Sequence, residues 1–260
     1  MIFLKLGGSL ITDKARAETA RGDVIHRMAE EIAAFQQRSP DSLLLIGHGS
    51  GSFGHHVAAR YKTQLGASTT EDWHGFARVW HAAQRLNRLL MDALHQNGLP
   101  AVNFPPSASA VCEDGLLEEL NTASIQSALK AGVLPVVHGD VAFDRKRGCT
   151  IVSTEQVFTF LAAPLQPRRI LLAGIEPGIH ADPDTPASIL PEIHAADLPH
   201  LSLRGTKGAD VTGGMSTKVA SAFAILERCP QAEVHIFSPR AHGDLVAALE
   251  GGSPGTRVLP

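Results

Sequence analysis

The feature that most constrains the fold is a short apolar run leading directly into a glycine-rich loop. Residues 43–46 are typical of a buried strand, and four glycines follow within residues 47–54. Glycine accepts positive φ angles and lets backbone N–H groups approach a ligand closely. We expect a helix to begin near Ser52, where unpaired amides add partial positive charge. The segment therefore predicts an anion-binding loop, with phosphate as its natural ligand.

Strand and helix patterns alternate along the rest of the chain. Apolar runs typical of strands occur at residues 2–6, 43–46, 101–104, 133–137, 169–173, 233–237 and 256–259. Helical spacing of apolar residues occurs at residues 25–35, 73–95, 122–131, 157–161, 210–226 and 242–249. This alternation predicts an α/β fold, a three-layer α/β/α sandwich with a mainly parallel sheet. Because no linker or internal repeat interrupts it, we expect a single domain over residues 1–260.

Several local expectations accompany this fold. Asp23 is expected to cap the helix over 25–35, and Trp80 to lie on the apolar face of the long helix. A hairpin is predicted around residues 144–148. Residues 180–209 are rich in Pro, His, Asp and Ser and are expected to form irregular, mobile surface.

Composition excludes several classes of protein. The net charge is −3 and the pI is about 6.5, which argues against a general nucleic-acid or membrane-surface binder. No apolar run approaches membrane-spanning length, and the run at the N-terminus is too short for a signal peptide. The three cysteines are far apart and lack C-x-x-C spacing, as expected of reduced thiols in a cytoplasmic protein.

Lysines are concentrated beside glycines. Of seven lysines, four lie in or next to glycine-rich segments: Lys5, Lys14, Lys207 and Lys218. A compact ammonium suits phosphate oxygens, although chance placement would give the same pattern. Glycine-rich stretches occur at residues 7–9, 47–54, 174–178 and 213–214. Each one alone can be an ordinary turn, but loops beyond the carboxyl ends of strands could line one crevice.

Two familiar nucleotide motifs do not account for these loops. Residues 49–54 formally match the G-x-G-x-x-G dinucleotide fingerprint. The match is weak, because that motif normally follows the first strand and an acidic residue ends the next strand. No G-x-x-x-x-G-K-[ST] motif occurs either. Two histidines, His74 and His81, share a helix face, but no third ligand is nearby, so no metal-ligating set is expected.

Three motifs together resemble the amino acid kinase superfamily. They are Lys-Leu-Gly-Gly-Ser at 5–9 with Asp13-Lys14, His-Gly-Ser-Gly-Ser-Phe-Gly-His at 48–55, and Asp-Val-Thr-Gly-Gly-Met at 210–215 with Lys218. Leu86-Asn87 and His138-Gly139-Asp140 extend the resemblance over nearly the whole chain. Within the superfamily the chain is most similar to the isopentenyl phosphate kinase family, and His55 is the most specific part of that similarity.

The resemblance implies a role for each matched position. It implies catalytic roles for Lys5, Lys14 and His55, and contact with the acceptor phosphate for Ser50, His55 and Thr154. It also implies ATP contacts for Lys5, Leu6, Gly7, Gly8, Ser9, Gly51, Gly174, Ile175, Glu176, Pro177, Gly178, Ile179, Gly214 and Lys218. ATP and Mg²⁺ are the implied cofactors, and a homodimer is the implied assembly. The N-terminal part would bind the acceptor and the C-terminal part the nucleotide.

The chain departs from the family pattern near the acceptor. Ser153-Thr154-Glu155 replaces the usual Ser-Gly-Asp, and Ser50 replaces a glycine. These changes leave the acceptor open. The first hypothesis is phosphorylation of isopentenyl phosphate, and the second is a related kinase acting on a phosphonate such as fosfomycin. The third is a nucleotide-binding regulatory protein without turnover, against which the retained lysines and His55 count.

Overall fold

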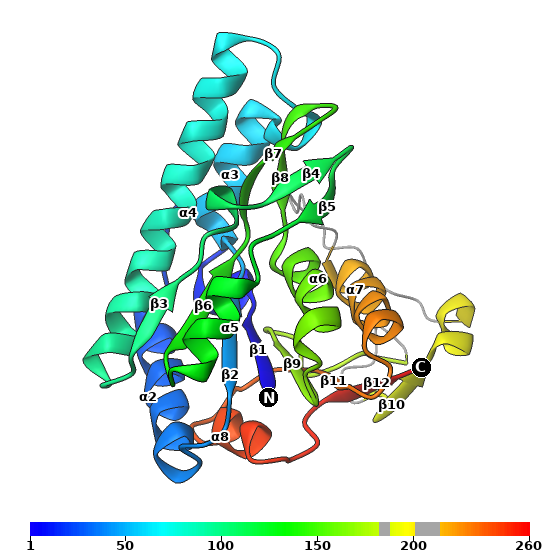
Figure 1. Ribbon diagram of the computed structural model, residues 1–260. Helices are drawn as coiled ribbons and strands as arrows, with labels where there is room; N and C mark the ends of the chain where they lie inside the picture. Colours follow the sequence, from blue (N-terminus) through cyan, green and yellow to red (C-terminus); the bar gives the residue numbers. More distant parts are fainter. Residues whose placement is uncertain (182–187, 201–213) are drawn as a thin grey trace.

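The computed structural model describes residues 1–181, 188–200 and 214–260. Its main sheet has eight strands in the order β10-β12-β11-β9-β1-β2-β6-β3, and helices cover both faces (Figure 1). Neighbouring strands are parallel except for the antiparallel pair β11 and β12. The strands are β1 (Ile2–Leu6), β2 (Leu44–His48), β3 (Ala101–Asn103), β6 (Leu134–His138), β9 (Arg169–Ala173), β10 (Glu192–His194), β11 (Glu233–Phe237) and β12 (Thr256–Leu259). The predicted α/β/α sandwich is confirmed.

The helices form two layers with a hydrophobic core under each. They are α1 (Gly8–Ile11), α2 (Gly22–Arg38), α3 (Gly51–Tyr61), α4 (Thr70–Gln96), α5 (Ala123–Lys130), α6 (Thr154–Leu165), α7 (Gly214–Arg228) and α8 (Asp244–Leu249). Side chains of β1 alternate between the cores: Phe3 packs in the core with α5, α6 and α7, and Leu4 in the core with α2, α4 and α8. Burial on both faces explains why the central strands are continuously apolar.

A second sheet extends beyond the carboxyl end of β6. Its order is β5 (Leu116–Glu119), β4 (Val111–Glu113), β7 (Asp140–Asp144) and β8 (Gly148–Val152). The β7–β8 hairpin confirms the prediction around residues 144–148. Asp144 closes it, because its carboxylate accepts hydrogen bonds from the N–H groups of Lys146 and Arg147 at 2.9 and 2.8 Å.

Three local predictions were wrong. The N-cap of α2 is Arg21, and Asp23 lies in the first turn, where its charge still suits the helix dipole. Trp80 is 42% exposed, so it does not lie on the buried face of α4. The segment 180–209 contains a strand, β10, which pairs with β12. Its residues 182–187 and 201–209 lie outside the described residues. In the part of the chain that the structure describes, no helix is both long and apolar enough to cross a membrane.

Candidate active site

The loops that follow β9, β1 and β2 contact one another, because these strands are parallel neighbours. A Cβ atom added at Gly8 would lie 2.6 Å from the Cα atom of Gly51, and one added at Gly7 would lie 2.8 Å from the carbonyl oxygen of Ala173. No side chain tolerates such separations from backbone, so glycine is required where these loops meet. Three of the four glycine-rich loops, at residues 7–9, 47–54 and 174–178, do lie together.

The start of α3 carries two amides that suit an anion. Gly51 has a φ of +50°, a left-handed conformation that favours glycine. The N–H of Ser52 donates to Oγ1 of Thr12 at 3.0 Å, which attaches the helix to the segment after α1. Within the described ranges, the N–H groups of Ser50 and Gly51 donate to no other residue. These two amides at a helix N-terminus are therefore available to a phosphate.

Lys5 and Glu155 form a buried ion pair next to these loops. Lys5 lies in β1, Glu155 lies in the first turn of α6, and the Nζ atom of Lys5 contacts Oε1 of Glu155. Burial alone would raise the pKa of the Glu155 carboxyl, but the ammonium of Lys5 outweighs it, and the pKa is lowered. Glu155 therefore stays ionised and fixes the position of the Lys5 ammonium.

Lys218 brings a second, partly buried ammonium to the same place. Its Nζ atom would lie 2.7 Å from a Cβ atom added at Gly174. Burial and the nearby charge of Lys5 lower the pKa of Lys218 to about 8, although Glu155 raises it. The exposed Lys14 also lowers the pKa of Lys218, so its charge lies within electrostatic reach. Two lysines from the N-terminal segment and one from α7 therefore gather at the glycine loops.

His55 lies one turn along α3 from Gly51 and is partly exposed. A small apolar cluster lies next to His55 and connects α3 with α4 and the β7–β8 hairpin. The cluster contains buried Ala58, Val79 and Val141, with Val57, Phe76 and Ile151 packed against them. An imidazole with apolar side chains on the following turn suits a ligand that has a polar head and a hydrocarbon tail.

Thr154 directs its hydroxyl into the fold. The Oγ1 atom donates to the carbonyl oxygen of His48 at 2.6 Å, and the residue is 1% exposed. Its methyl group occupies the space beside Gly47, where an added Cβ atom would lie 2.5 Å away. Thr154, which replaces the usual glycine of the family pattern, is thus accommodated inside the fold. What Thr154 can offer an anion is its backbone N–H in the first turn of α6.

The loop after β9 has two parts. Ile175 and Glu176 are exposed, next to Gly174 and Lys218. Ile179 is buried, and its N–H donates to Oγ1 of Thr256 at 2.7 Å. The first part therefore lies at the candidate site, and the second is bound to β12.

The other predicted nucleotide contacts lie at the first and last glycine loops. The carbonyl of Leu6 accepts a hydrogen bond from the N–H of Gly49 at 3.1 Å, which joins β1 to the next loop. Ser9 belongs to α1, and Gly214 begins α7 with a φ of +65°. Lys207 and residues 210–213 lie outside the described residues.

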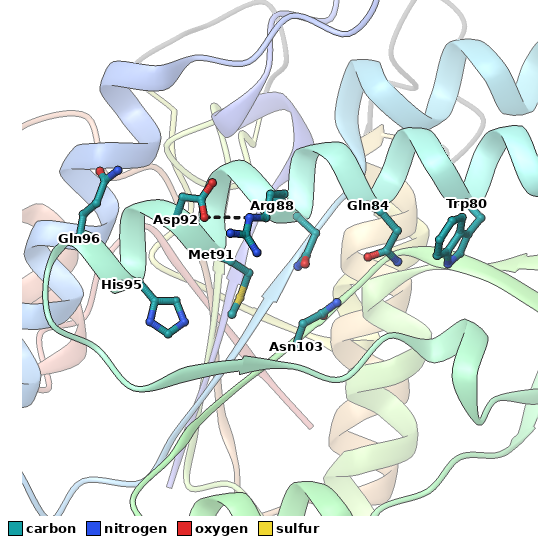
Figure 2. Close-up of a pocket in the computed structure, with 9 residues that line it drawn as sticks. Trp80, Gln84, Arg88, Met91, Asp92, His95, Gln96 and Asn103 are labelled. Carbon is teal, nitrogen blue, oxygen red and sulfur yellow. Dashed lines mark ion pairs between the residues drawn. The ribbon is translucent and has the colours of Figure 1, made fainter.

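A hollow of about 760 Å³ lies between α4 and the edge strand β3 (Figure 2). Its lining residues belong to these two elements alone and include an ion pair of Arg88 with Asp92 at 2.9 Å. Gln84 and Asn87 also line it. The same two side chains contact a pair of buried histidines, His138 and His48 respectively. The hollow is thus separated from the glycine loops by this polar layer.

Sequence reasoning did not assign Glu155 or the buried histidines to the site. Glu155 is marked only as a departure from the family pattern, and it lies 150 residues from its partner Lys5. Spacing carries no signal over such a distance. The sequence does contain one signal for this pair. Glu155 lies at a helix start that departs from the family pattern, and such a carboxylate is a candidate partner for lysines that have no acidic residue near them in the sequence.

The comparisons with known proteins agree with this geometry. Residues 1–238 match the model of the amino acid kinase family. The isopentenyl phosphate kinase of Methanothermobacter thermautotrophicus is 35% identical, with 99% of this chain and 98% of that protein covered. The enzymes of the same name from Haloferax volcanii and Methanocaldococcus jannaschii are 35% and 31% identical, with the same coverage.

A solved structure of an isopentenyl phosphate kinase superposes with a TM-score of 0.83 at 31% identity, covering 99% of both chains. The Thermoplasma acidophilum isopentenyl phosphate kinase, in a product complex, gives 0.79 over 99% of both chains at 23% identity, which supports the fold alone. Family match, full-length relatives and the gathered glycine loops lead to one conclusion: the chain belongs to the amino acid kinase family.

Proposed function

We propose that the protein is an ATP-dependent kinase that phosphorylates isopentenyl phosphate and so produces isopentenyl diphosphate. Three relatives that match almost the whole chain carry the name of that activity. The observation that carries the proposal is the apolar cluster next to His55, on the same helix as the loop amides. Its partly buried members, Val57, Phe76 and Ile151, offer surface for a short hydrocarbon tail once Ser50 and His55 bind the phosphate head.

The acceptor needs little chemical activation. A phosphate monoester has a second pKa of about 6, so it is mostly a dianion at neutral pH. One of its oxygens attacks the γ-phosphorus of ATP, the bond from that phosphorus to the β–γ bridging oxygen breaks, and ADP leaves with the electron pair. Because two anions approach each other, fixed positive charge and in-line positioning matter more than a general base.

Three lysines supply positive charge in this proposal. Lys5 and Lys218 neutralise ATP phosphates, with Glu155 fixing Lys5, and Lys14 stabilises the transferring phosphoryl group. The loop at residues 7–9 and the first part of the loop at residues 174–179 hold the nucleotide. The N-terminal part of a single domain thus binds the acceptor, through Ser50, His55 and the Thr154 amide, and the C-terminal part contributes most of the nucleotide site.

Mg²⁺ belongs to the proposal as a companion of the nucleotide. No group of three or more His, Cys, Asp or Glu side chains placed to hold a metal ion occurs among the described residues. The ion usually keeps several waters and binds one or two carboxylates together with substrate phosphates. We therefore propose that the ion would be held chiefly by the phosphates of ATP.

The remaining expectations concern assembly and location. We propose a homodimer, for which the edge strand β3 and the exposed Trp80 beside the hollow of Figure 2 are candidate contacts. A cytoplasmic location is supported by three free cysteines, all buried. Light scattering after gel filtration measures the assembly directly.

The proposal is tested by ADP release in a coupled assay with a panel of acceptors. The panel contains isopentenyl phosphate, dimethylallyl phosphate, fosfomycin and ethyl phosphate. Ethyl phosphate keeps the head group but has three fewer carbons, so kcat/KM should be about 10- to 100-fold lower than for isopentenyl phosphate if the tail is buried. Equal rates for these two acceptors would remove the role of the apolar cluster. No turnover on any acceptor would overturn the proposed kinase.

Fosfomycin serves as the discriminating acceptor in that panel. A phosphonate kinase requires a small polar pocket, whereas the side chains next to His55 are apolar. We therefore expect fosfomycin to be a poor acceptor.

A further inference from the structure

His48, the last residue of β2, is fully buried and held in one tautomer. The Nδ2 amide of Asn87 lies 3.0 Å from its Nε2 atom. An amide NH₂ is a donor, so Nε2 must accept, and the ring proton must be on Nδ1. That N–H donates to the carbonyl oxygen of Gly49 at 3.2 Å. Burial and the neighbouring His138 lower the pKa of His48 to about 3, so the ring is neutral at physiological pH.

In the two peptide units that join His48, Gly49 and Ser50, the hydrogen bonds leave one N–H group unused. The carbonyl of His48 accepts from the N–H of Gly139 at 3.0 Å and from the hydroxyl of Thr154 at 2.6 Å. The N–H of Gly49 donates to the last carbonyl of β1 at 3.1 Å. In the next peptide unit, the His48 ring donates to the carbonyl oxygen of Gly49. Because this peptide is trans, the N–H at its other end, which belongs to Ser50, points in the opposite direction. Of these two peptide units, only that N–H lacks a partner among the described residues.

We propose that His48 is a positioning residue, which holds the Gly49 carbonyl so that the N–H of Ser50 points at the acceptor phosphate. The proposal rests on the proposed function, which assigns this loop to the acceptor. It gives a role to Asn87 as well, because its amide dictates which ring nitrogen faces the loop.

The neighbouring strand repeats the arrangement and braces it. In β6 the Nδ1 atom of His138 lies 3.0 Å from the carbonyl of Gly139, and Gln84 contacts its Nε2 atom at 3.4 Å. The rings of His48 and His138 are stacked, with centroids 5.1 Å apart and planes 24° from parallel. Stacking between two fully buried rings restricts rotation of either, so the Gly49 carbonyl has a fixed partner.

Two substitutions separate positioning from simple packing. In His48→Asn the amide nitrogen takes the place of Nδ1 and can still donate to Gly49. In His48→Gln the amide reaches the place of Nε2, so contact with Asn87 is kept and the donor to Gly49 is lost. Both variants remove the ring and its stacking on His138. A packing role predicts the same defect in both, and a positioning role predicts a defect in His48→Gln. The exposed His95, which lies near the other end of α4 and contacts Ala101, provides the control His95→Gln.

The direct readout is the Ser50 amide signal in ¹H–¹⁵N NMR as inorganic phosphate is added. It should shift in the wild type, in His48→Asn and in His95→Gln, and much less in His48→Gln. In kinetics, His48→Gln should raise KM for isopentenyl phosphate by about tenfold or more, with KM for ATP within about threefold, since one bond to a charged group is misdirected. His48→Asn should restore KM for the acceptor to within about threefold of wild type.

These readouts keep the two proposals apart. A wild type that shows the Ser50 shift but does not turn over isopentenyl phosphate contradicts the kinase and leaves the positioning role standing. Equal behaviour of the two His48 variants, or no Ser50 shift in the wild type, overturns the positioning role even if the kinase is active. Should His48→Gln fail to fold, ¹⁵N-histidine spectra of the wild type decide, because a proton on Nε2 of His48 is incompatible with the proposal.

Discussion

His55 and His56 are consecutive residues of α3, so their side chains point about 100° apart. His55 is partly buried and His56 is exposed. The helix therefore presents two chemically identical side chains in different surroundings, one of them on the turn that precedes the apolar cluster. This pair allows a test of the role proposed for His55 at the scale of a single residue.

We predict that His55→Ala lowers kcat/KM for isopentenyl phosphate by about 10- to 100-fold, since a hydrogen bond to a charged phosphate is lost. KM for ATP should change little, because the nucleotide lysines are untouched. The matched variant His56→Ala should keep both parameters within about twofold, as expected of an exposed position. Initial-rate kinetics with each substrate varied in turn provide the measurement. Similar losses in both variants would point to damage of α3 and remove the assigned role.

At the scale of elements, α8 depends on a side chain from another helix. Glu31 of α2 is 1% exposed, and its Oε2 atom accepts hydrogen bonds from the N–H groups of Leu245 and Val246 at 2.9 and 3.1 Å. These amides belong to the first turn of α8, whose own N-cap residue, Gly243, has no side chain to cap it. The carboxylate of α2 thus caps α8.

We predict that Glu31→Ala lowers the free energy of unfolding by about 2–4 kcal/mol, because two buried amides lose their acceptor. Glu31→Gln keeps a side-chain oxygen of the same reach and should recover at least half of that loss. Urea denaturation of both variants measures the difference. If the two variants are equally destabilised, capping by the side-chain oxygen is not the cause.

The elements also show what could be read from the sequence. Strands β1, β2 and β9 were predicted because burial on both faces makes them continuous apolar runs. Strands β4 and β5 were missed, since Leu116 and Glu119 are exposed and the strands are only three and four residues long. Trp80 was misplaced because helical spacing does not distinguish a buried face from a face that borders a surface hollow.

The candidate site also has one part that could be predicted from the sequence and one part that could not. Glycines and lysines at strand ends carry a local signal, so the loops of β1, β2 and β9 could be brought together from the order of elements alone. The pairing of Lys5 with Glu155 and the hydrogen bond of His48 with Asn87 join distant elements. Such contacts depend on the packing of α4 and α6 against the sheet, which no spacing in the sequence encodes.

At the scale of the whole molecule, buried histidines couple folding to pH. Burial lowers the pKa of both His48 and His235, and the neighbouring His138 and Arg169, respectively, lower it further. In the unfolded chain each imidazole takes up a proton near its ordinary pKa of about 6.5. Between that pH and the lower pKa of the fold, the unfolded state binds more protons, so acid favours unfolding. The lowered pKa values of Glu155 and Asp144 act in the same direction, but near pH 4 and below.

We therefore predict that the free energy of unfolding falls as the pH decreases from 7 to 5, by at most about 1.4 kcal/mol per pH unit for each such histidine. His235→Phe keeps a buried ring in β11 without a titrating group, so its stability should depend less steeply on pH. The exposed His81 supplies the control, and His81→Gln should retain the wild-type slope. Urea denaturation at pH 7, 6 and 5 gives the three slopes. His235 is a suitable position because it lies in the sheet away from the glycine loops, and its replacement leaves their lysines and histidines in place. If the His235→Phe slope is as steep as that of the wild type, the loss of stability at low pH arises from other groups.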